Sequence, residues 1–177
     1  MEINLLKKIK EGDKHAFADL YNEYAEYALR VAMAVIRNKV SAADAVQEAF
    51  IKVYKNIHSF DLDRSFGPWF YRILINECNR VLSKIPKATD INEYAEEDKS
   101  ISIKDKYKFE EYENLYKAIQ NLEDINRVPI ILKYLKGFKE AEIADILETN
   151  VNTVKSRLFK GRQKLKNLIE EFERSKE

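Results

Sequence analysis

The stretch from residue 152 to 168, NTVKSRLFKGRQKLKNL, limits what this chain can fold into more than any other. If it is wound as a helix at about 100° per residue, its small and apolar residues fall on one side: Val154, Leu158, Gly161, Leu165, Leu168 and Phe172. No acidic residue lies between Thr149 and Ile169, so the outer face carries cations without a negative charge. Such a face suits a polyanion, because Lys and Arg near phosphates release condensed counterions. A solvated basic helix end is the alternative that this stretch alone leaves open.

A second helical pattern lies just before this stretch. Residues 140–147 repeat apolar side chains at helical spacing, and Thr149 and Asn150 then interrupt the pattern. Asn150 or Asn152 can cap the basic helix, since an Asn side-chain oxygen accepts from the free amides of the next turn. Helix, short turn and basic helix form a helix-turn-helix, whose second helix enters the major groove of DNA. The outward Phe159 can then contact a thymine methyl or pack on a partner.

The composition indicates an ordinary globular protein that remains inside the cell. The 177 residues are 45% apolar, and the formal net charge is only +1, so the cations are a local feature of the C-terminal region. A single cysteine, Cys78, rules out an internal disulfide framework and fits a reducing cytoplasm. The first residues lack the apolar core of a signal peptide, and no run approaches the ~20 apolar residues that span a bilayer. We therefore expect a cytoplasmic protein without membrane insertion.

Low glycine and proline content and helical periodicity predict an all-α fold. Asp13, Ser41 (with Asp44) and Ser65 are expected N-caps, and Gly137 is an expected helix stop. The expected organisation is two small helical domains, residues 1–84 and 112–177, with the helix-turn-helix in a four-helix C-terminal domain. A flexible linker, residues 85–111, is expected between them, because nine acids face five bases from residue 86 to 113 and periodicity fades. Helices are expected at 2–10, 14–37, 41–57, 66–84, 112–121, 126–135, 140–147 and 152–168.

The second and third expected helices differ in what their faces carry. The second has an aromatic and aliphatic stripe, including Phe17, Tyr21 and Tyr24, which we interpret as core. The third has an apolar seam and an opposite face of mixed character, made of Asp44, Gln47, Glu48, Ile51 and Lys55. That face is either solvated surface or an interface with Ile51 as its dry centre.

The helix expected after Ser65 is rich in side chains that serve single-stranded nucleic acid. Aromatic rings can stack on bases, while amides and guanidinium groups can contact bases or phosphates. The alternative is that the rings of Trp69 and Phe70 pack with Ile73 and Leu74 against the preceding helices. The side chains in question are Phe66, Trp69, Phe70, Tyr71, Arg72, Asn76, Asn79 and Arg80.

Several strings in order now resemble one family. Four segments, in this order and at these separations, are similar to an RNA polymerase sigma factor of the sigma-70 family: DAVQEAFIKVYKNIHSF, WFYRILIN, EIADIL and TVKSRLFKGRQKL. The short two-domain form resembles the extracytoplasmic-function group. The resemblance covers residues 13–84 and 112–171, and several motifs in register are more specific than a lone helix-turn-helix.

The resemblance implies a factor that binds core RNA polymerase, selects promoters and helps to melt the minus-10 region. It implies no enzymatic activity, no cofactor and no metal, and it implies an anti-sigma factor as a further partner. The residues 44, 47, 48, 51 and 55 match the helix that docks on the clamp of the largest polymerase subunit. The resemblance also implies which residues contact minus-10 DNA: Phe60, Asp61, Arg64, Phe66, Arg72, Asn76, Asn79 and Arg80. For minus-35 DNA, the resemblance implies contacts from Asn152, Thr153, Lys155, Ser156, Arg157, Phe159, Lys160, Arg162 and Lys166.

The chain departs from the family pattern at four positions. Arg80 stands where an Asp is common, and Ser83 where an Arg is common, so phosphate contacts are expected to be redistributed. Lys139 replaces a Ser or Thr cap and Glu148 a turn glycine, each at a cost of about 1 kcal/mol. A stand-alone helix-turn-helix regulator is the alternative, but it leaves residues 44–83 unexplained. An enzyme is disfavoured, because the two histidines and Cys78 form no cluster with catalytic or metal-ligand spacing.

Overall fold

The structure is a computed structural model, and it describes residues 2–84, 115 and 117–174. The expected linker, residues 85–111, lies outside the described residues. Throughout the described ranges the regular structure is helical, with no strand among them. The all-α prediction is therefore confirmed.

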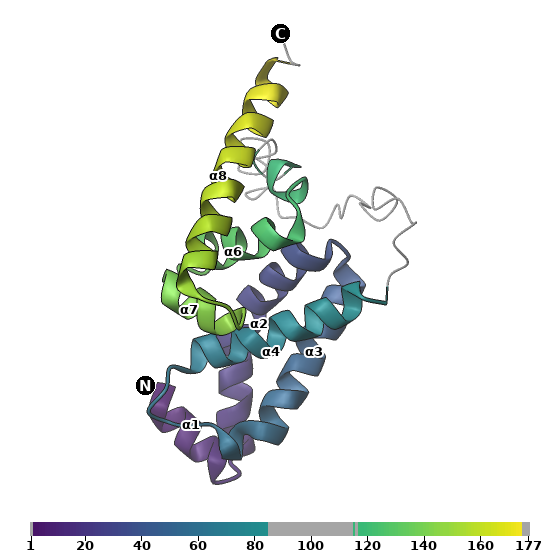
Figure 1. The fold of residues 1–177 in the computed structure, drawn as a ribbon. Helices are drawn as coiled ribbons and strands as arrows, with labels where there is room; N and C mark the ends of the chain where they lie inside the picture. Colours follow the sequence, from purple (N-terminus) through teal and green to yellow (C-terminus); the bar gives the residue numbers. More distant parts are fainter. Residues whose placement is uncertain (1, 85–114, 116, 175–177) are drawn as a thin grey trace.

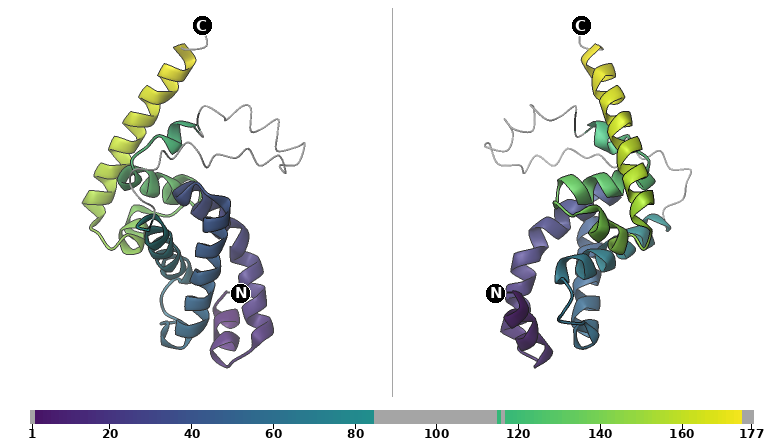
Figure 2. Two further views of the ribbon diagram at one scale, coloured as in Figure 1. Left: turned by 90° about the vertical axis from the view of Figure 1, so that its right-hand side faces the viewer. Right: turned by 60° about the vertical axis from the view of Figure 1, so that its left-hand side comes forward.

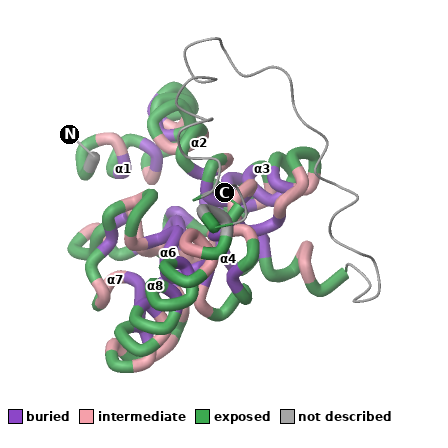
Figure 3. Tube along the Cα trace, turned by 90° about the horizontal axis from the view of Figure 1, so that it is seen from above, coloured by how far each residue is buried: buried purple, intermediate pink, exposed green. Residues whose placement is uncertain are grey.

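The N-terminal half is built from four α-helices that wrap an aromatic core. They are α1 (Glu2–Lys10), α2 (Lys14–Ile36), α3 (Lys39–Asn56) and α4 (Phe66–Leu82), with a 3₁₀ turn, η1 (Ile57–Ser59), after α3. The helices α2, α3 and α4 pack pairwise (Figure 1). Phe50 and Phe70 meet at the centre, with ring centroids 5.0 Å apart. Figure 3 shows the buried positions along the facing sides of these helices.

The helix starts in this half confirm one predicted cap and correct another. The Asp13 carboxylate accepts from the backbone N–H of His15 at 2.9 Å, as an N-cap should. For α3 the predicted Ser41 cap is wrong, because the helix already begins at Lys39. Asn38 is the N-cap, and its side-chain oxygen accepts from the Ser41 N–H at 2.9 Å. Ser65 occupies the N-cap position of α4 without a side-chain hydrogen bond.

The C-terminal half contains α6 (Asp124–Tyr134), α7 (Glu140–Ile146) and α8 (Val151–Arg174), preceded by helical residues at 117–120. The helix α8 runs past the other helices toward the C-terminus (Figure 2). It packs on α6 and α7, as a helix-turn-helix requires. The helix α6 begins two residues before the predicted Asn126, and α8 continues beyond Leu168.

The turn between α7 and α8 has the geometry expected of its residues. The side-chain oxygen of Asn150 accepts from the Thr153 N–H at 2.7 Å, so Asn150 caps α8. Glu148 adopts φ 48°, the left-handed conformation that a glycine would take without strain. At the start of α7, the Glu142 carboxylate accepts from the Lys139 N–H at 2.8 Å, which partly replaces the missing Ser or Thr cap.

Candidate nucleic-acid and polymerase interfaces

The helix α8 divides into a buried seam and an exposed face, as predicted. Val154 and Leu158 are almost completely buried, and Leu165 is buried too. Gly161 allows the close approach of α6, because a Cβ at this position would lie 2.9 Å from Cγ1 of Ile130. The seam therefore fixes which face of α8 meets solvent. The side chain of Phe172 lies outside the described part.

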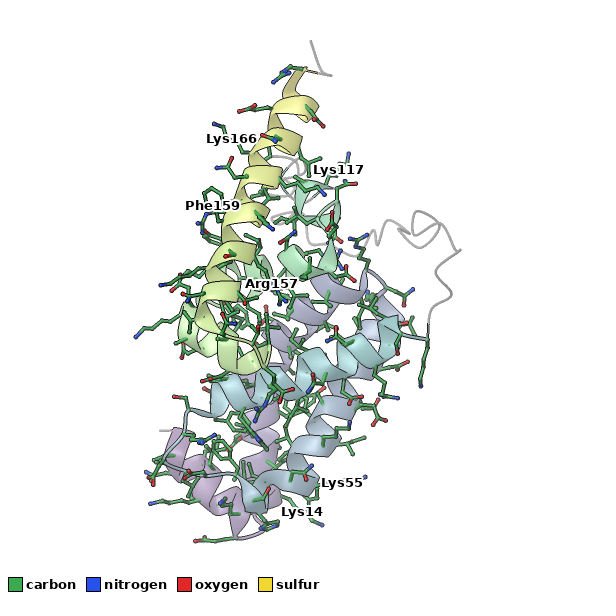
Figure 4. The ribbon with its side chains drawn as sticks, in the orientation of Figure 1. Lys14, Lys55, Lys117, Arg157, Phe159 and Lys166 are labelled. Carbon is green, nitrogen blue, oxygen red and sulfur yellow. The ribbon has the colours of Figure 1, made fainter. Side chains whose placement is uncertain are left out.

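The exposed face of α8, here called the reading face, consists of Asn152, Lys155, Ser156, Phe159, Lys160 and Arg162. Phe159 is 57% exposed, which is unusual for a large apolar ring. A shallow hollow is lined by residues from Lys155 to Arg162. Figure 4 shows Phe159 and Lys166 projecting from α8. Of the other predicted minus-35 residues, Thr153 and Arg157 are half-buried and Lys166 is exposed.

The cations of α8 differ in whether the protein itself neutralises them. Lys164 lies 3.0 Å from a carboxylate oxygen of Glu123, and Lys166 lies 3.9 Å from Glu170. Within the described ranges, Lys155 and Lys160 form no ion pair. Arg162 reaches only the hydroxyl of Tyr134, at 3.5 Å. The cations of the reading face are thus available to an external anion.

A second exposed feature is an apolar groove between α2 and α3, with a volume of about 680 Å³. Gln47, Ile51 and Lys55 of the predicted polymerase surface line it. Asp44 is exposed beside this face, and Glu48 is half-buried. The groove, called the α2–α3 groove below, therefore brings together most of the predicted surface.

Sequence reasoning missed two aromatic residues of this groove. Tyr21, interpreted as core, is 45% exposed, and Tyr54 is 48% exposed. The interpretation of Tyr21 was wrong, because the helical stripe of α2 is wider than the contact it makes with α3. Tyr54 could have been found from its spacing, since it follows Ile51 by three residues on the same helix face.

The loop before α4 is held by rings that were assigned to DNA. Phe60 and Phe66 are almost completely buried, with centroids 5.7 Å apart. Trp69 is half-buried and lies 4.8 Å from Phe60. These rings face the core in this structure, so they pack within the protein and are not exposed for stacking on bases. Asp61 and Arg64 remain exposed, 3.9 Å apart.

Two guanidinium groups assigned to minus-10 DNA are engaged within the protein. Arg80 lies 2.7 Å from Glu77, a carboxylate that is buried and that also accepts a short bond from Lys52. Arg72 lies 3.4 Å from Glu148 in the helix-turn-helix turn. Asn76 and Asn79 are exposed.

Burial alone would raise the pKa of Glu77, but the hydrogen bonds from Lys52 and Arg80 outweigh it and lower this pKa. The unusual Arg80 thus compensates a buried carboxylate of its own helix. Burial raises the pKa of Cys78 to about 12, so its thiol is unreactive at neutral pH.

Neither a metal centre nor a membrane segment emerges from the part of the chain that the structure describes. No group of three or more His, Cys, Asp and Glu side chains there could hold a metal ion. Among the same residues, no helix combines the length and apolar character that crossing a bilayer requires.

Both halves of the chain match models of known protein families. Residues 20–85 match the model of sigma-70 region 2, and residues 112–165 match that of sigma-70 region 4. The chain is 32% identical to the ECF RNA polymerase sigma factor SigW of Bacillus subtilis, over 94% of this chain and 96% of SigW. It is also 32% identical to the ECF RNA polymerase sigma-E factor of Escherichia coli, over 94% of this chain and 93% of the relative.

Solved structures show the same fold. CnrH in complex with the cytosolic domain of CnrY matches with a TM-score of 0.73 and 20% identity, over 95% of this chain and 96% of CnrH. RpoE of Bartonella quintana, solved with the anti-sigma factor NepR, matches with a TM-score of 0.64 and 22% identity, over 86% and 97% of the two chains.

A stand-alone regulator is not favoured, because the matches include the N-terminal half that such a protein does not need. The chain therefore belongs to the extracytoplasmic-function group of the sigma-70 family, and it is an alternative, non-enzymatic sigma factor that directs RNA polymerase to promoters.

Proposed function

We propose that α8 reads the minus-35 element through its reading face. The observation that carries this proposal is the combination of the exposed Phe159 with cations that have no carboxylate partner among the described residues. The buried seam holds the helix on α6 and α7, so the N-terminal turns of α8 can enter a major groove as a rigid unit. Lys155 and Ser156 are the proposed base-reading side chains.

The α2–α3 groove is the proposed docking site for the polymerase clamp. Its apolar lining with exposed Ile51, Tyr21 and Tyr54 resembles the dry centre of a protein interface. Gln47 and Lys55 supply a polar rim at its edge, and Figure 4 shows Lys55 projecting outward from α3. A coiled-coil partner fits, because it can lay apolar side chains into a groove between two helices.

The minus-10 contacts are proposed to come from the exposed polar side chains of α4 and its preceding loop. Asn76 and Asn79 face solvent, and so do Asp61 and Arg64. The buried Phe60 and Phe66 would then support the loop from below instead of stacking on bases. Flipping a base costs a few kcal/mol of stacking, which such contacts must offset.

These proposals give each of three segments of the chain a separate role. Residues 1–84 would bind polymerase and minus-10 DNA, residues 112–177 would bind minus-35 DNA, and residues 85–111 would connect them. A cytoplasmic location is proposed, because RNA polymerase works there. An anti-sigma factor is proposed as a regulator, with support from solved structures of similar fold that contain one.

Run-off transcription tests the function directly. Purified core polymerase would be given a promoter library, with and without this chain. We expect transcripts that depend on the chain, and their upstream sequences would supply its minus-35 element. No transcripts together with no co-elution with core polymerase would refute the proposal.

Base reading is tested on the recovered promoters. Lys155→Ala and Ser156→Ala should each cost about 1–3 kcal/mol on promoters with the preferred minus-35 bases and leave co-elution with core polymerase intact. An equal loss on every promoter would show that these side chains contact only phosphates.

The docking groove is tested by a paired substitution. Gln47→Ala with Ile51→Ala should reduce co-elution with core polymerase, because it removes the centre and part of the rim of the groove. Exposed Ala43 also lines the groove, and Ala43→Ser is a mild control there. Unchanged co-elution of the double variant would exclude this surface.

A further inference from the structure

A carboxylate of α4 is buried between two cations that come from two helices. The side chain of Glu77 is only 2% exposed. Its Oε1 accepts a short hydrogen bond from Nζ of Lys52 in α3, and its Oε2 accepts from Nε of Arg80 in α4 at 2.7 Å. The helices α3 and α4 lie side by side (Figure 1). We call these three side chains the Glu77 cluster.

The two cations of the Glu77 cluster reach the surface, although the carboxylate does not. The side chains of Lys52 and Arg80 are 48% and 45% exposed. An ammonium group has three N–H donors and a guanidinium group has five, but each cation gives Glu77 only one bond. Within the described ranges, no other group accepts from Nζ of Lys52 or from the two Nη atoms of Arg80. These donors are therefore available to an acceptor from outside the protein.

The Glu77 cluster carries a net positive charge. Burial would raise the pKa of Glu77, but the hydrogen bonds from Lys52 and Arg80 lower it, so the carboxylate is ionised at neutral pH. One negative charge then faces two positive charges, which leaves a net charge of +1. Because both buried oxygens need a donor, the second cation could serve the fold alone. Such a role would not require both cations to stay half-exposed.

The Glu77 cluster depends on a position where this chain departs from the family pattern. Arg80 stands where an Asp is common, and Ser83 stands where an Arg is common. An Asp at position 80 would lie one helical turn from Glu77, where two like charges repel. Arg80 instead gives Glu77 a partner and returns a cation to this end of α4. The expected redistribution of phosphate contacts therefore has a candidate location, at Lys52 and Arg80.

The Glu77 cluster continues the exposed polar face of α4. Arg80 follows Asn76 by four residues, so the two side chains lie on the same side of the helix. Asn76 is exposed and is a proposed minus-10 contact. Lys52 does not line the α2–α3 groove, although its neighbour Ile51 does. The cluster therefore belongs with the proposed DNA surface and not with the proposed polymerase surface.

The chemistry of these donors suits a phosphodiester group. The two free oxygens of one phosphate can accept charge-assisted bonds from an ammonium and from a guanidinium group at the same time. Because both cations are bound to one carboxylate, their nitrogens are held close enough to share such a group. The Nε of Arg80 can stay on Glu77 while its Nη atoms donate outward, so the phosphate does not displace the carboxylate. Glu77 thus orders two long side chains before DNA arrives, and less conformational entropy is lost on binding.

We propose that Lys52 and Arg80, held in place by Glu77, bind a single phosphate group of the minus-10 strand. Lys52 is then a DNA contact from α3, outside the residues that the sequence pattern indicated. Glu77 is a positioning residue, because it touches the cations and not the DNA. This inference rests on the proposed minus-10 role of α4. It adds to that role a phosphate site that depends on this chain's own Arg80.

A promoter fragment with one neutral phosphate at a time tests the shared site. Core polymerase with the full chain would bind a promoter recovered by run-off transcription, prepared with the minus-10 strand unpaired. A methylphosphonate, in which a methyl group replaces one charged phosphate oxygen, would be placed at each position of that strand in turn. At one position it should weaken binding by the parent chain but not by Lys52→Ala or Arg80→Ala. We expect the same position for both variants.

The unmodified strand gives the size of each contact. Lys52→Ala and Arg80→Ala should each weaken binding by about five-fold at about 0.1 M salt, as the loss of one single-strand phosphate contact predicts. Lys14→Ala is the matched control, because Lys14 is exposed on α2, outside the Glu77 cluster, and forms no ion pair within the described ranges. It should change binding little at any methylphosphonate position. Co-elution with core polymerase should be the same for all three variants and the parent.

The variant Glu77→Gln separates positioning from charge. It removes one negative charge, so net charge alone predicts tighter DNA binding. Loss of positioning predicts weaker binding, by about two- to ten-fold, because the cationic side chains must then be ordered when DNA binds. Arg80→Lys keeps the charge, but one ammonium group cannot hold Glu77 and the phosphate as a guanidinium fork does. It should restore only part of what Arg80→Ala loses, whereas Lys52→Arg should retain binding.

Several results would overturn the inference. If the loss in Lys52→Ala is the same at every methylphosphonate position, Lys52 only supports the fold. If Lys52→Ala and Arg80→Ala respond at different positions, or if Glu77→Gln binds more tightly than the parent, there is no shared site. If Lys52→Ala no longer co-elutes with core polymerase, Lys52 belongs to the polymerase interface.

The charge-retaining variants decide if an alanine variant fails to fold by circular dichroism. Lys52→Arg should keep the sensitivity to the shared phosphate, and Arg80→Lys should reduce it; equal sensitivity in both would contradict the site. Failure of the proposed function has a different signature, because the parent with core polymerase would then bind no promoter. A parent that binds the promoter but shows no methylphosphonate position coupled to Lys52 or Arg80 refutes the phosphate site alone.

Discussion

The helices α4 and α8 are both proposed to contact promoter DNA, yet they present their side chains in opposite ways. On α8 the seam residues Val154, Leu158 and Leu165 are buried, and the cations Lys155 and Lys160 are unpaired within the described ranges. On α4 the cations already have carboxylate partners, Glu148 for Arg72 and Glu77 for Arg80. The two lysines of α8 are thus available to an external anion, whereas the two arginines of α4 are already paired with carboxylates of the protein.

This difference shows that a sequence pattern typical of DNA contact does not by itself produce a surface with unpaired cations. An Arg that is already paired must exchange one anion for another or share itself between two, and the net gain is small. A cation without a protein partner gains the full release of counterions. We therefore expect the free chain to meet duplex DNA first through α8.

The largest expected effect contrasts one phenylalanine from each helix. Phe66→Ala should lower the free energy of unfolding by about 3–5 kcal/mol, because the ring is buried in the aromatic core. Phe159→Ala should change it by less than about 0.5 kcal/mol, since its ring is exposed. Urea unfolding followed by circular dichroism measures both. Similar losses in the two variants would contradict the assignment of Phe66 to core and Phe159 to the reading face.

The buried carboxylate of α4 predicts a dependence of stability on pH. Glu77→Gln should cost about 1–2 kcal/mol at neutral pH, because Lys52 and Arg80 lose a charged acceptor but can turn partly to solvent. The pKa of Glu77 is lowered by folding, so its contribution is present above the ordinary value of 4.5 and is lost as pH falls through the folded pKa.

Unfolding free energies of Glu77→Gln and the parent chain should therefore converge in acid. A difference that stays constant from pH 7 down to pH values well below 4.5 would contradict a charged Glu77. Exposed Asp63, which forms no ion pair in the part described, gives the matched control as Asp63→Asn.

The sequence was sufficient for the features that depend on local periodicity. The seam of α8 follows from residues spaced three and four apart, and the Asp13 cap follows from a side chain with a strong local hydrogen bond. For α8 the sequence offered Asn150 or Asn152 as the cap, and the structure selects Asn150. The start of α3 was misplaced because Asn38 and Ser41 are both good N-cap residues, three positions apart. Only the backbone direction before Lys39 decides between them.

The interface between the halves could not be predicted from local pattern. Arg127 reads as a surface residue in sequence, but it is buried against Val35, which lies 92 residues earlier. Nothing in the spacing of α2 marks that carbonyl oxygen as an acceptor. The partners of Arg72 and Tyr71 likewise come from the far half of the chain. The sequence was thus enough to propose candidate site residues, but it could not indicate which groups of the protein those residues already contact.

A smaller effect tests how firmly α8 is anchored at its start. Asn150→Ala should lower the free energy of unfolding by about 1 kcal/mol, because the Thr153 N–H loses its acceptor. Asn152→Ala is the matched control, since Asn152 is exposed in the same turn and does not cap the helix. Thermal unfolding measures both variants. Equal shifts would mean that the cap bond contributes nothing.

The smallest effect separates an unpaired from a paired lysine on α8 itself. Lys160→Ala should weaken binding to all minus-35 duplexes alike and reduce the slope of log affinity against log salt by about one, since one phosphate contact is lost. Lys164→Ala removes the same charge from a lysine that already lies 3.0 Å from Glu123, so its effect on the slope should be smaller. Fluorescence anisotropy at several salt concentrations measures both slopes. If the two variants change the slope equally, only net charge matters, and the contrast between free and neutralised cations does not govern DNA binding.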